Sequence, residues 1–143
     1  MQVIAGEILD AAVDLRKGST TFGKWLGVRL SSANHQMIWL PKGFAHGFLT
    51  LSESADVLYK VTDFYAPQHE RPLLWNDPDV AVEWPLQGEP ILSDEDRAGM
   101  RLVPKTSWST CLDAQSGNAE RFAGRRIASC SFCAARFVGL VQE

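Results

Sequence analysis

The sequence predicts an all-β fold, built as an antiparallel sandwich or barrel. Short runs of β-branched and aromatic residues recur along the chain, and apolar residues alternate within them with a period close to two. Clusters of Gly, Pro, Asn and Asp separate these runs at the spacing that is typical of such folds. No long segment has the 3.6-residue period of an amphipathic helix, so a helical class is not indicated.

The first two predicted strands cover residues 11–18 and 25–31. The first, AAVDLRKG, alternates loosely and stops at Gly18. The second, WLGVRLS, alternates clearly, so its residues fall on two opposite faces of a strand. These faces are Leu26, Val28 and Leu30 on one side and Trp25, Gly27 and Arg29 on the other.

The remaining predicted strands are short runs rich in β-branched and aromatic residues. They cover residues 36–41, which Pro41 ends, and residues 45–52, 56–65 and 79–85. One helical turn is predicted at SDEDRAGM, because Ser93 is a good N-cap and the acidic residues after it lie near the positive end of the helix dipole.

Length and composition indicate one soluble domain with a real core in a chain of 143 residues. The longest apolar runs are only a few residues, so no membrane span is expected. The start lacks a basic segment followed by an apolar one, which favours a cytoplasmic location. A net charge of -3 and the lack of a basic stripe argue against a nucleic-acid partner.

Residue usage changes near residue 103 and divides the chain into a body, residues 1–103, and a tail, residues 104–143. The body holds 9 Lys and Arg against 14 Asp and Glu and no cysteine, whereas the tail holds 5 against 3 and all three cysteines. We therefore expect the tail not to share the core of the body. The tail has no clean period, and we expect it to be disordered or helical in part, with an amphipathic helix over residues 119–141.

Two residues are candidates for acid–base or ligand-binding chemistry, and each has a structural alternative. Tyr59 in DVLYKVTD is either a core aromatic with a hydrogen-bonded hydroxyl or a proton-donating phenol inside an apolar barrel. His46 in KGFAHGF is either a satisfied structural histidine or an imidazole that contacts an anionic ligand. The small residues around His46 would leave room for such a ligand.

Other candidates carry weaker signals. Asp96 is most simply a carboxylate at a helix start, and its functional alternative is to orient a histidine base. Cys130 and Cys133 form a CxxC without a preceding strand or further ligands, so two unrelated thiols are the simpler interpretation. The three histidines are not spaced as the ligands of a common metal motif, and GSTTFGKW contains no phosphate-binding loop of the familiar kind.

Several long motifs of the body resemble the dTDP-4-dehydrorhamnose 3,5-epimerase family, a group of cupin-like sugar-nucleotide epimerases. They are the LRK-S-TFG stretch, P-GFAHGF, LYK-T-FYAP, WNDPD and EWP, and the similarity covers about residues 3–101. The resemblance implies a cupin-like jelly-roll barrel, or double-stranded β-helix. The similarity is to the C-terminal two-thirds of the family's chain, so we expect the barrel to be incomplete at the N-terminus.

The resemblance also implies an activity and its partners. The family inverts two stereocentres that flank the C4 ketone of dTDP-4-dehydro-6-deoxyglucose, on the route to dTDP-L-rhamnose and cell-surface polysaccharides such as lipopolysaccharide. It works as a homodimer on a dTDP-sugar substrate without metal or organic cofactor. Such chemistry needs a base to remove a proton next to the ketone, donors to hold the enolate, and an acid on the opposite face.

Five residues match functional positions of the family. Tyr59 stands at the proton donor, and Asp96 at the aspartate that pairs with the catalytic histidine. His46 matches a substrate-binding histidine near the sugar diphosphate. Tyr65 matches the aromatic that stacks on the thymine ring, and Glu70 a further substrate contact.

The chain also departs from the family pattern in three ways. The family's base is a histidine in an R-G-x-H-x-Q type segment, which these 143 residues do not contain. Glu95 stands where close relatives often carry lysine, and residues 104–143 do not resemble the family's C-terminus. We therefore expect an epimerase whose activity is impaired. The alternatives are a non-catalytic thymidine-nucleotide-binding or interaction remnant of the fold, and a related 3-epimerase or ketoisomerase.

Overall fold

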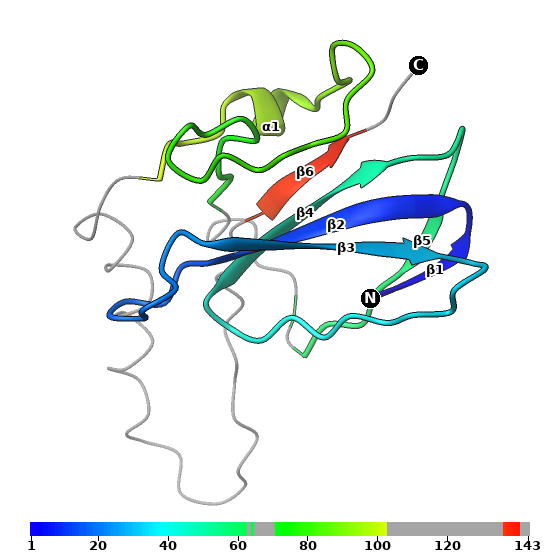
Figure 1. Cartoon of the computed structure of the whole chain (residues 1–143), viewed down its shortest axis with the longest axis horizontal. Helices are drawn as coiled ribbons and strands as arrows, with labels where there is room; N and C mark the ends of the chain where they lie inside the picture. The colour runs from blue at the N-terminus through cyan, green and yellow to red at the C-terminus, as the bar shows by residue number, and fades with distance from the viewer. Residues whose placement is uncertain (63, 65–70, 103–135, 141–143) are drawn as a thin grey trace, which may run out of the picture.

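The computed structural model describes residues 1–62, 64 and 71–102, together with the backbone of residues 136–140 (Figure 1). Within these ranges the regular structure is strands, apart from one helical turn, α1 (Asp94–Arg97). The all-β prediction is therefore confirmed. No helix in the described ranges is long and apolar enough to cross a membrane.

A four-stranded sheet forms the centre of the fold (Figure 1). Its strands, in spatial order, are β3 (Trp25–Ser31), β2 (Glu7–Asp14), β4 (Phe44–Thr50) and β6 (Arg136–Leu140). β2 pairs antiparallel with both β3 and β4, while β6 runs parallel to β4. Because side chains alternate along each strand, this register fixes which residues share each face of the sheet.

One face of this sheet, which we call the inner face, is covered by a two-stranded sheet. The smaller sheet pairs β1 (Gln2–Ala5) with β5 (Asp56–Leu58) in antiparallel fashion. Val3 of β1 packs with Ile8 and Leu30 of the larger sheet into one buried cluster. The cover is partial, because Leu26, which has the inner-face parity of Leu30, is 64% exposed.

The opposite face, which we call the outer face, is covered by residues 71–102. This segment winds over the sheet with α1 as its one described helix (Figure 1). Leu73 and Val80 of the segment pack against Val13 and Ala45 of the sheet, and all four are buried. A second cluster surrounds Leu49 with Leu51, Trp75, Trp84, Leu86 and Leu92.

The outer-face segment is tied together by Asp77, which is only 1% exposed. One oxygen of its carboxylate accepts a hydrogen bond from the backbone N–H of Asp79 at 2.8 Å, and the other accepts one from the backbone N–H of Leu102. A buried carboxylate that accepts backbone hydrogen bonds is satisfied within the fold. Asp77, in the WNDPD motif, therefore has a structural role.

A second buried carboxylate, Asp14, holds the turn between β2 and β3. It accepts hydrogen bonds from the Arg16 guanidinium at 2.8 and 2.9 Å, and from the hydroxyls of Ser19 and Thr21 at 2.6 Å each. The Arg16 hydrogen bond is the main reason that the pKa of Asp14 lies well below its usual value. The LRK-S-TFG motif thus has a structural explanation.

Two of the predicted strands are absent. At residues 36–41, Met37 makes only an isolated bridge to Gln2. At residues 79–85, Ala81 has a φ of 51°, which interrupts an extended run, and Trp84 turns onto the outer-face core. β1, by contrast, is a strand that sequence reasoning missed.

The prediction of a helix over residues 119–141 is wrong for residues 136–140, which form β6. The segment RFVGL carries aromatic and β-branched residues that suit a strand. The free edge of β4 offers it backbone hydrogen-bond partners, and β6 pairs there with His46 as the partner of Arg136. In these residues the tail is part of the sheet of the body.

Candidate functional site

Asp10 on β2 and His46 on β4 are two titratable residues that lie next to each other on the inner face. In the register of the two strands, His46 lies beside Ala12, and Asp10 lies one step further along the same face, beside Phe48. Oδ2 of Asp10 and Nδ1 of His46 are 3.7 Å apart. The side chain of Asp10 is fully buried, whereas that of His46 is 28% exposed. The pair therefore runs from the interior of the fold to its surface.

Neither oxygen of the Asp10 carboxylate has a hydrogen-bond partner among the described residues, and neither has Nδ1 of His46. Across the sheet Asp10 faces Val28 and Phe48, which have no polar groups to offer. A buried carboxylate without partners costs several kcal/mol unless a charge or donor compensates it, which sets Asp10 apart from Asp14 and Asp77.

Sequence reasoning missed Asp10. The available signal was its place in EILDAAVD, where every residue from Asp10 to Leu15 is buried. A central strand that is covered on both faces reads as a nearly continuous apolar run, and a carboxylate inside such a run is rarely fully buried without a partner. The residue was overlooked because the alternation of this strand was loose.

The glycines next to His46 do not make room for a ligand, so that expectation is wrong. Gly43 has a φ of +84°, and a Cβ at this position would lie 2.6 Å from Cγ of Arg16. Its absence lets the Arg16 guanidinium lie 4.7 Å from the ring centroid of Phe44. Gly47 is buried opposite Ala11, on the outer face. His46 reaches the inner face through strand alternation alone.

Tyr59 lies just beyond β5 and is 66% exposed. The interpretation of Tyr59 as a core aromatic, or as a phenol enclosed in an apolar barrel, is therefore not met in the described structure. The physical reason is that β5 ends at Leu58 and, among the described strands, pairs with β1 alone. Val57 would lie on the same face as Tyr59 in a continuous strand, and it still packs against the inner-face core.

Asp96 is 7% exposed and lies on α1. The Ser93 hydroxyl donates to its Oδ2 at 2.6 Å and accepts a hydrogen bond from its backbone N–H at 3.2 Å. The predicted helical turn with Ser93 as N-cap is thus confirmed. No contact between described residues joins Asp96 to His46 or to Tyr59, and its pairing with a histidine base stays a prediction.

The other two predicted substrate contacts, Tyr65 and Glu70, lie outside the described residues, as do Cys130 and Cys133. Within the described ranges, no three His, Cys, Asp or Glu side chains lie close enough together to hold a metal ion.

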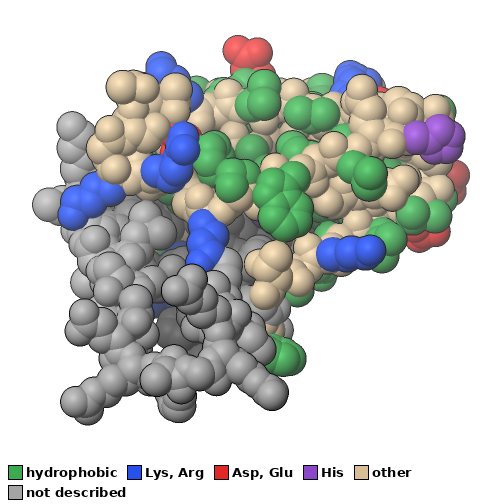
Figure 2. Space-filling view, turned by 90° about the horizontal axis from the view of Figure 1, so that it is seen from below, with side chains coloured by type: hydrophobic (Ala, Val, Ile, Leu, Met, Phe, Trp, Pro, Cys, Tyr) green, Lys and Arg blue, Asp and Glu red, His purple; other side chains and the backbone are tan. Residues whose placement is uncertain are grey.

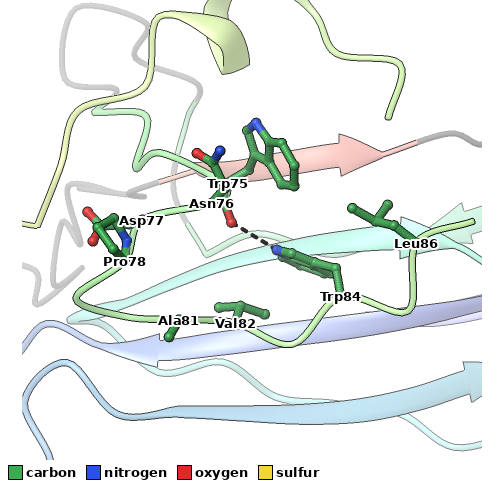
Figure 3. A pocket seen from close by; sticks show the side chains of 8 residues that line it. All are labelled: Trp75, Asn76, Asp77, Pro78, Ala81, Val82, Trp84 and Leu86. Atoms are coloured by element: carbon green, nitrogen blue, oxygen red, sulfur yellow. Dashed lines mark hydrogen bonds between the residues drawn. The ribbon is translucent and has the colours of Figure 1, made fainter. Parts of the chain in front are cut away.

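A cavity of about 200 Å³ lies within the outer-face segment (Figure 3). It is lined by Trp75, Asn76, Asp77, Pro78, Ala81, Val82, Trp84 and Leu86. The indole N–H of Trp84 donates to the backbone carbonyl of Trp75 at 2.9 Å, which closes the loop on itself. Asp77, the one charged residue of this wall, already accepts backbone hydrogen bonds. None of the predicted site residues lines this cavity.

Comparison with known proteins gives a consistent result. The sequence profile of the family described as dTDP-4-dehydrorhamnose 3,5-epimerase matches residues 1–103. The protein of that name from Pseudomonas aeruginosa is 60% identical over 94 residues, which cover 66% of this chain and 52% of the relative. That from Neisseria gonorrhoeae is 52% identical over an alignment of 154 positions, which covers 88% of this chain and 47% of the relative. The chain spans about half the length of the curated relatives it matches.

Two solved structures are similar in fold as well as in sequence. An epimerase from Legionella pneumophila, solved with dTDP-4-keto-L-rhamnose, is 49% identical with a TM-score of 0.66, covering 68% of this chain and 52% of its own. One from Bacillus anthracis, solved with TDP and PPi, is 50% identical with a TM-score of 0.68, covering 71% and 57%. These neighbours have a cupin-like jelly-roll fold, so the predicted fold class is confirmed.

Proposed function

The chain belongs to the dTDP-4-dehydrorhamnose 3,5-epimerase family, and on that premise we propose that it takes part in the conversion of dTDP-4-dehydro-6-deoxyglucose to dTDP-4-dehydro-L-rhamnose. The observation that carries the proposal is the inner face of the sheet, which presents the half-buried imidazole of His46. A relative that is 49% identical over 68% of this chain was solved with dTDP-4-keto-L-rhamnose.

The proposed roles follow the chemistry of the reaction. Removal of a proton next to the C4 ketone leaves an enolate, and delivery of a proton to the opposite face of that carbon inverts the centre. We assign proton delivery to the phenol of Tyr59. His46 contacts the diphosphate, Tyr65 stacks on the thymine ring, and Glu70 makes a further substrate contact.

This assignment names no residue of the chain as the general base. Asp96 is assigned to pair with a catalytic histidine, yet none of the chain's three histidines matches the family's base. A positioned general base contributes about 10²–10⁴-fold to such a rate. We therefore propose that the 143-residue chain binds the nucleotide sugar but turns it over slowly by itself.

The test is solvent deuterium incorporation at C3 and C5 of the substrate, measured by NMR in D₂O. The chain should exchange these positions roughly 10²–10⁴-fold more slowly than the Pseudomonas aeruginosa relative, while calorimetry detects dTDP binding. Tyr59→Phe should lower the residual exchange further, and the exposed control Trp39→Phe should not.

Two results would count against the proposal. Exchange as fast as in the relative would show that another group of the chain acts as the base. If neither exchange nor binding at millimolar dTDP is detected, the assignment of substrate fails altogether.

We also propose that the chain forms a homodimer in the cytoplasm, and that residues 104–143 form a tail added to the family domain. Large apolar side chains support the association, because Ile4 is 55% and Leu58 50% exposed on the smaller sheet. Figure 2 shows hydrophobic side chains exposed between Lys and Arg on one face of the molecule. Light scattering of the purified chain measures its oligomeric state.

A further inference from the structure

We propose that Asp10 is the positioning residue of His46. Its buried carboxylate accepts a hydrogen bond from Nδ1–H of the imidazole and thereby turns Nε2 towards an anionic group, the diphosphate of a nucleotide, on the inner face. The nature of the ligand rests on the proposed function, whereas the coupling of Asp10 to His46 rests on the structure of the chain.

The geometry requires only a small movement of one partner. The separation of 3.7 Å between Oδ2 and Nδ1 lies within ion-pair range but exceeds the roughly 2.7–3.2 Å of an N–H···O hydrogen bond. Asp10 is held in β2, which is paired on both sides, and its side chain is fully buried. The imidazole is partly exposed, so a rotation of His46 closes the distance.

No other described group competes for the carboxylate. On the inner face of β2 its neighbours are Ile8 and Ala12, and across the sheet it faces Val28 on β3 and Phe48 on β4. The covering sheet contributes Val3 and Val57, which are apolar.

The nearest charged side chains on the same strand have partners of their own. Asp14 is bound by Arg16 and two hydroxyls, and Glu7 pairs with Arg29 on the outer face. Of the titratable groups in the described ranges, His46 is therefore the one that faces Asp10.

This pairing has a chemical consequence for the ligand. With a proton on Nδ1, the neutral imidazole presents the lone pair of Nε2 to the ligand side. When the ring is doubly protonated, the imidazolium can lie between the Asp10 carboxylate and the anionic ligand, with one N–H for each.

Replacing Asp10 should have different effects on stability if its role is purely structural than if it positions His46. Asp10→Asn is isosteric and removes the buried negative charge, so the positioning role predicts an unchanged or raised melting temperature, by up to about 6 °C. Asp10→Ser is the second variant, for the case that the amide of asparagine disrupts folding. Serine is smaller and still offers a hydroxyl group. Asp79→Asn is the matched control, since that side chain is 59% exposed.

The first measurement is ¹⁵N NMR of the imidazole of His46 in the full chain without ligand, with the signal assigned by its loss in His46→Gln. The wild-type ring should carry its proton on Nδ1 when neutral, and the tautomer should shift towards protonation at Nε2 in Asp10→Asn. The second is calorimetry with dTDP. Asp10→Asn should bind about 10–100-fold more weakly, by analogy with orienting partners of ligand histidines.

The outcomes separate the two proposals. An unchanged tautomer of His46 in Asp10→Asn and Asp10→Ser, or a lowered melting temperature with an unchanged tautomer, would overturn the positioning role. A shifted tautomer in a chain that does not bind dTDP would support the positioning role and reject the nucleotide as ligand.

Discussion

The two faces of the four-stranded sheet differ in how completely they are packed. On the outer face Val13, Leu49 and Leu73 are all fully buried, and the segment above them closes on itself through Asp77 and Trp84. On the inner face Ile8 and Leu30 are buried just as completely, but Leu26 is largely exposed. Asp10 is fully buried there without a hydrogen-bond partner among the described residues.

This difference shows that the inner face combines a stabilising core with a partly buried polar pair. Buried apolar area stabilises a fold by roughly 25 cal/mol per Å², and both faces contribute it, through Leu49 and Leu73 on the outer face and Ile8 and Leu30 on the inner face. Local violations of packing rules concentrate where a protein binds or reacts. The inner face carries such a violation at Asp10, beside the one described histidine that lies on a strand.

The largest effect is expected when the buried leucine of the outer-face core and the exposed leucine of the inner face are each replaced by alanine. Leu73→Ala on the outer face should destabilise the fold by about 2–5 kcal/mol, because it leaves a cavity beside a residue that is 0% exposed. Leu26→Ala on the inner face should change the free energy of unfolding by less than about 0.5 kcal/mol, because this side chain is 64% exposed. Urea unfolding measures both, and equal losses would show that the inner face is packed around Leu26 as fully as the outer face is around Leu73.

A second, smaller effect is expected at Asp14, which shares a strand and a face with Asp10. Asp14→Asn should destabilise the fold by about 1–3 kcal/mol, because it breaks hydrogen bonds from Arg16, Ser19 and Thr21 to a buried carboxylate. This loss of stability is smaller than that expected for a fully buried ion pair, because the Arg16 side chain is 51% exposed. Asp10→Asn should not share this loss.

The pH dependence of the unfolding free energy tests the same role of Asp14. The pKa of Asp14 is lowered in the folded state, so its contribution is complete above the unfolded pKa of about 3.9 and is lost as the pH falls towards the folded pKa. The difference in unfolding free energy between wild type and Asp14→Asn should be constant from about pH 8 to 5 and shrink below about pH 4. A difference that grows on acidification would contradict the assigned role.

The smallest effect concerns the closure of the outer-face segment. Trp84→Phe keeps an aromatic ring but removes the indole hydrogen bond to the carbonyl of Trp75, and it should destabilise the fold by about 0.5–1.5 kcal/mol. Trp39→Phe is the control, because Trp39 is 73% exposed. In thermal unfolding followed by circular dichroism, Trp84→Phe should have a clearly lower melting temperature than Trp39→Phe. Equal melting temperatures for the two variants would argue against this closure.

Sequence patterns predicted the elements whose signals are local. The strand at 25–31 was predicted with its correct bounds and faces, because β3 alternates strictly. The turn at Ser93 was predicted because an N-cap and the acidic residues after it lie within one turn of each other.

Elements that depend on distant partners were predicted poorly. The run at 79–85 has the composition of a strand, yet Ala81 turns it and Trp84 packs over the outer face. The tail segment at 136–140 became a strand because β4 offers it an edge. At the candidate site, the resemblance drew attention to His46 and Tyr59, but it did not indicate Asp10 or the exposure of the phenol.

By itself, the amino-acid sequence determined the all-β class, the family, and the presence of a histidine on a strand of the sheet, because period, turn residues and motifs are all properties of neighbouring positions. Only the tertiary structure decided that Asp10 lies 3.7 Å from His46, and that Asp14 has hydrogen-bond partners whereas Asp10 has none in the described part of the chain. The reason is that strand register brings together side chains 36 positions apart in the chain, and burial depends on which segments cover each face.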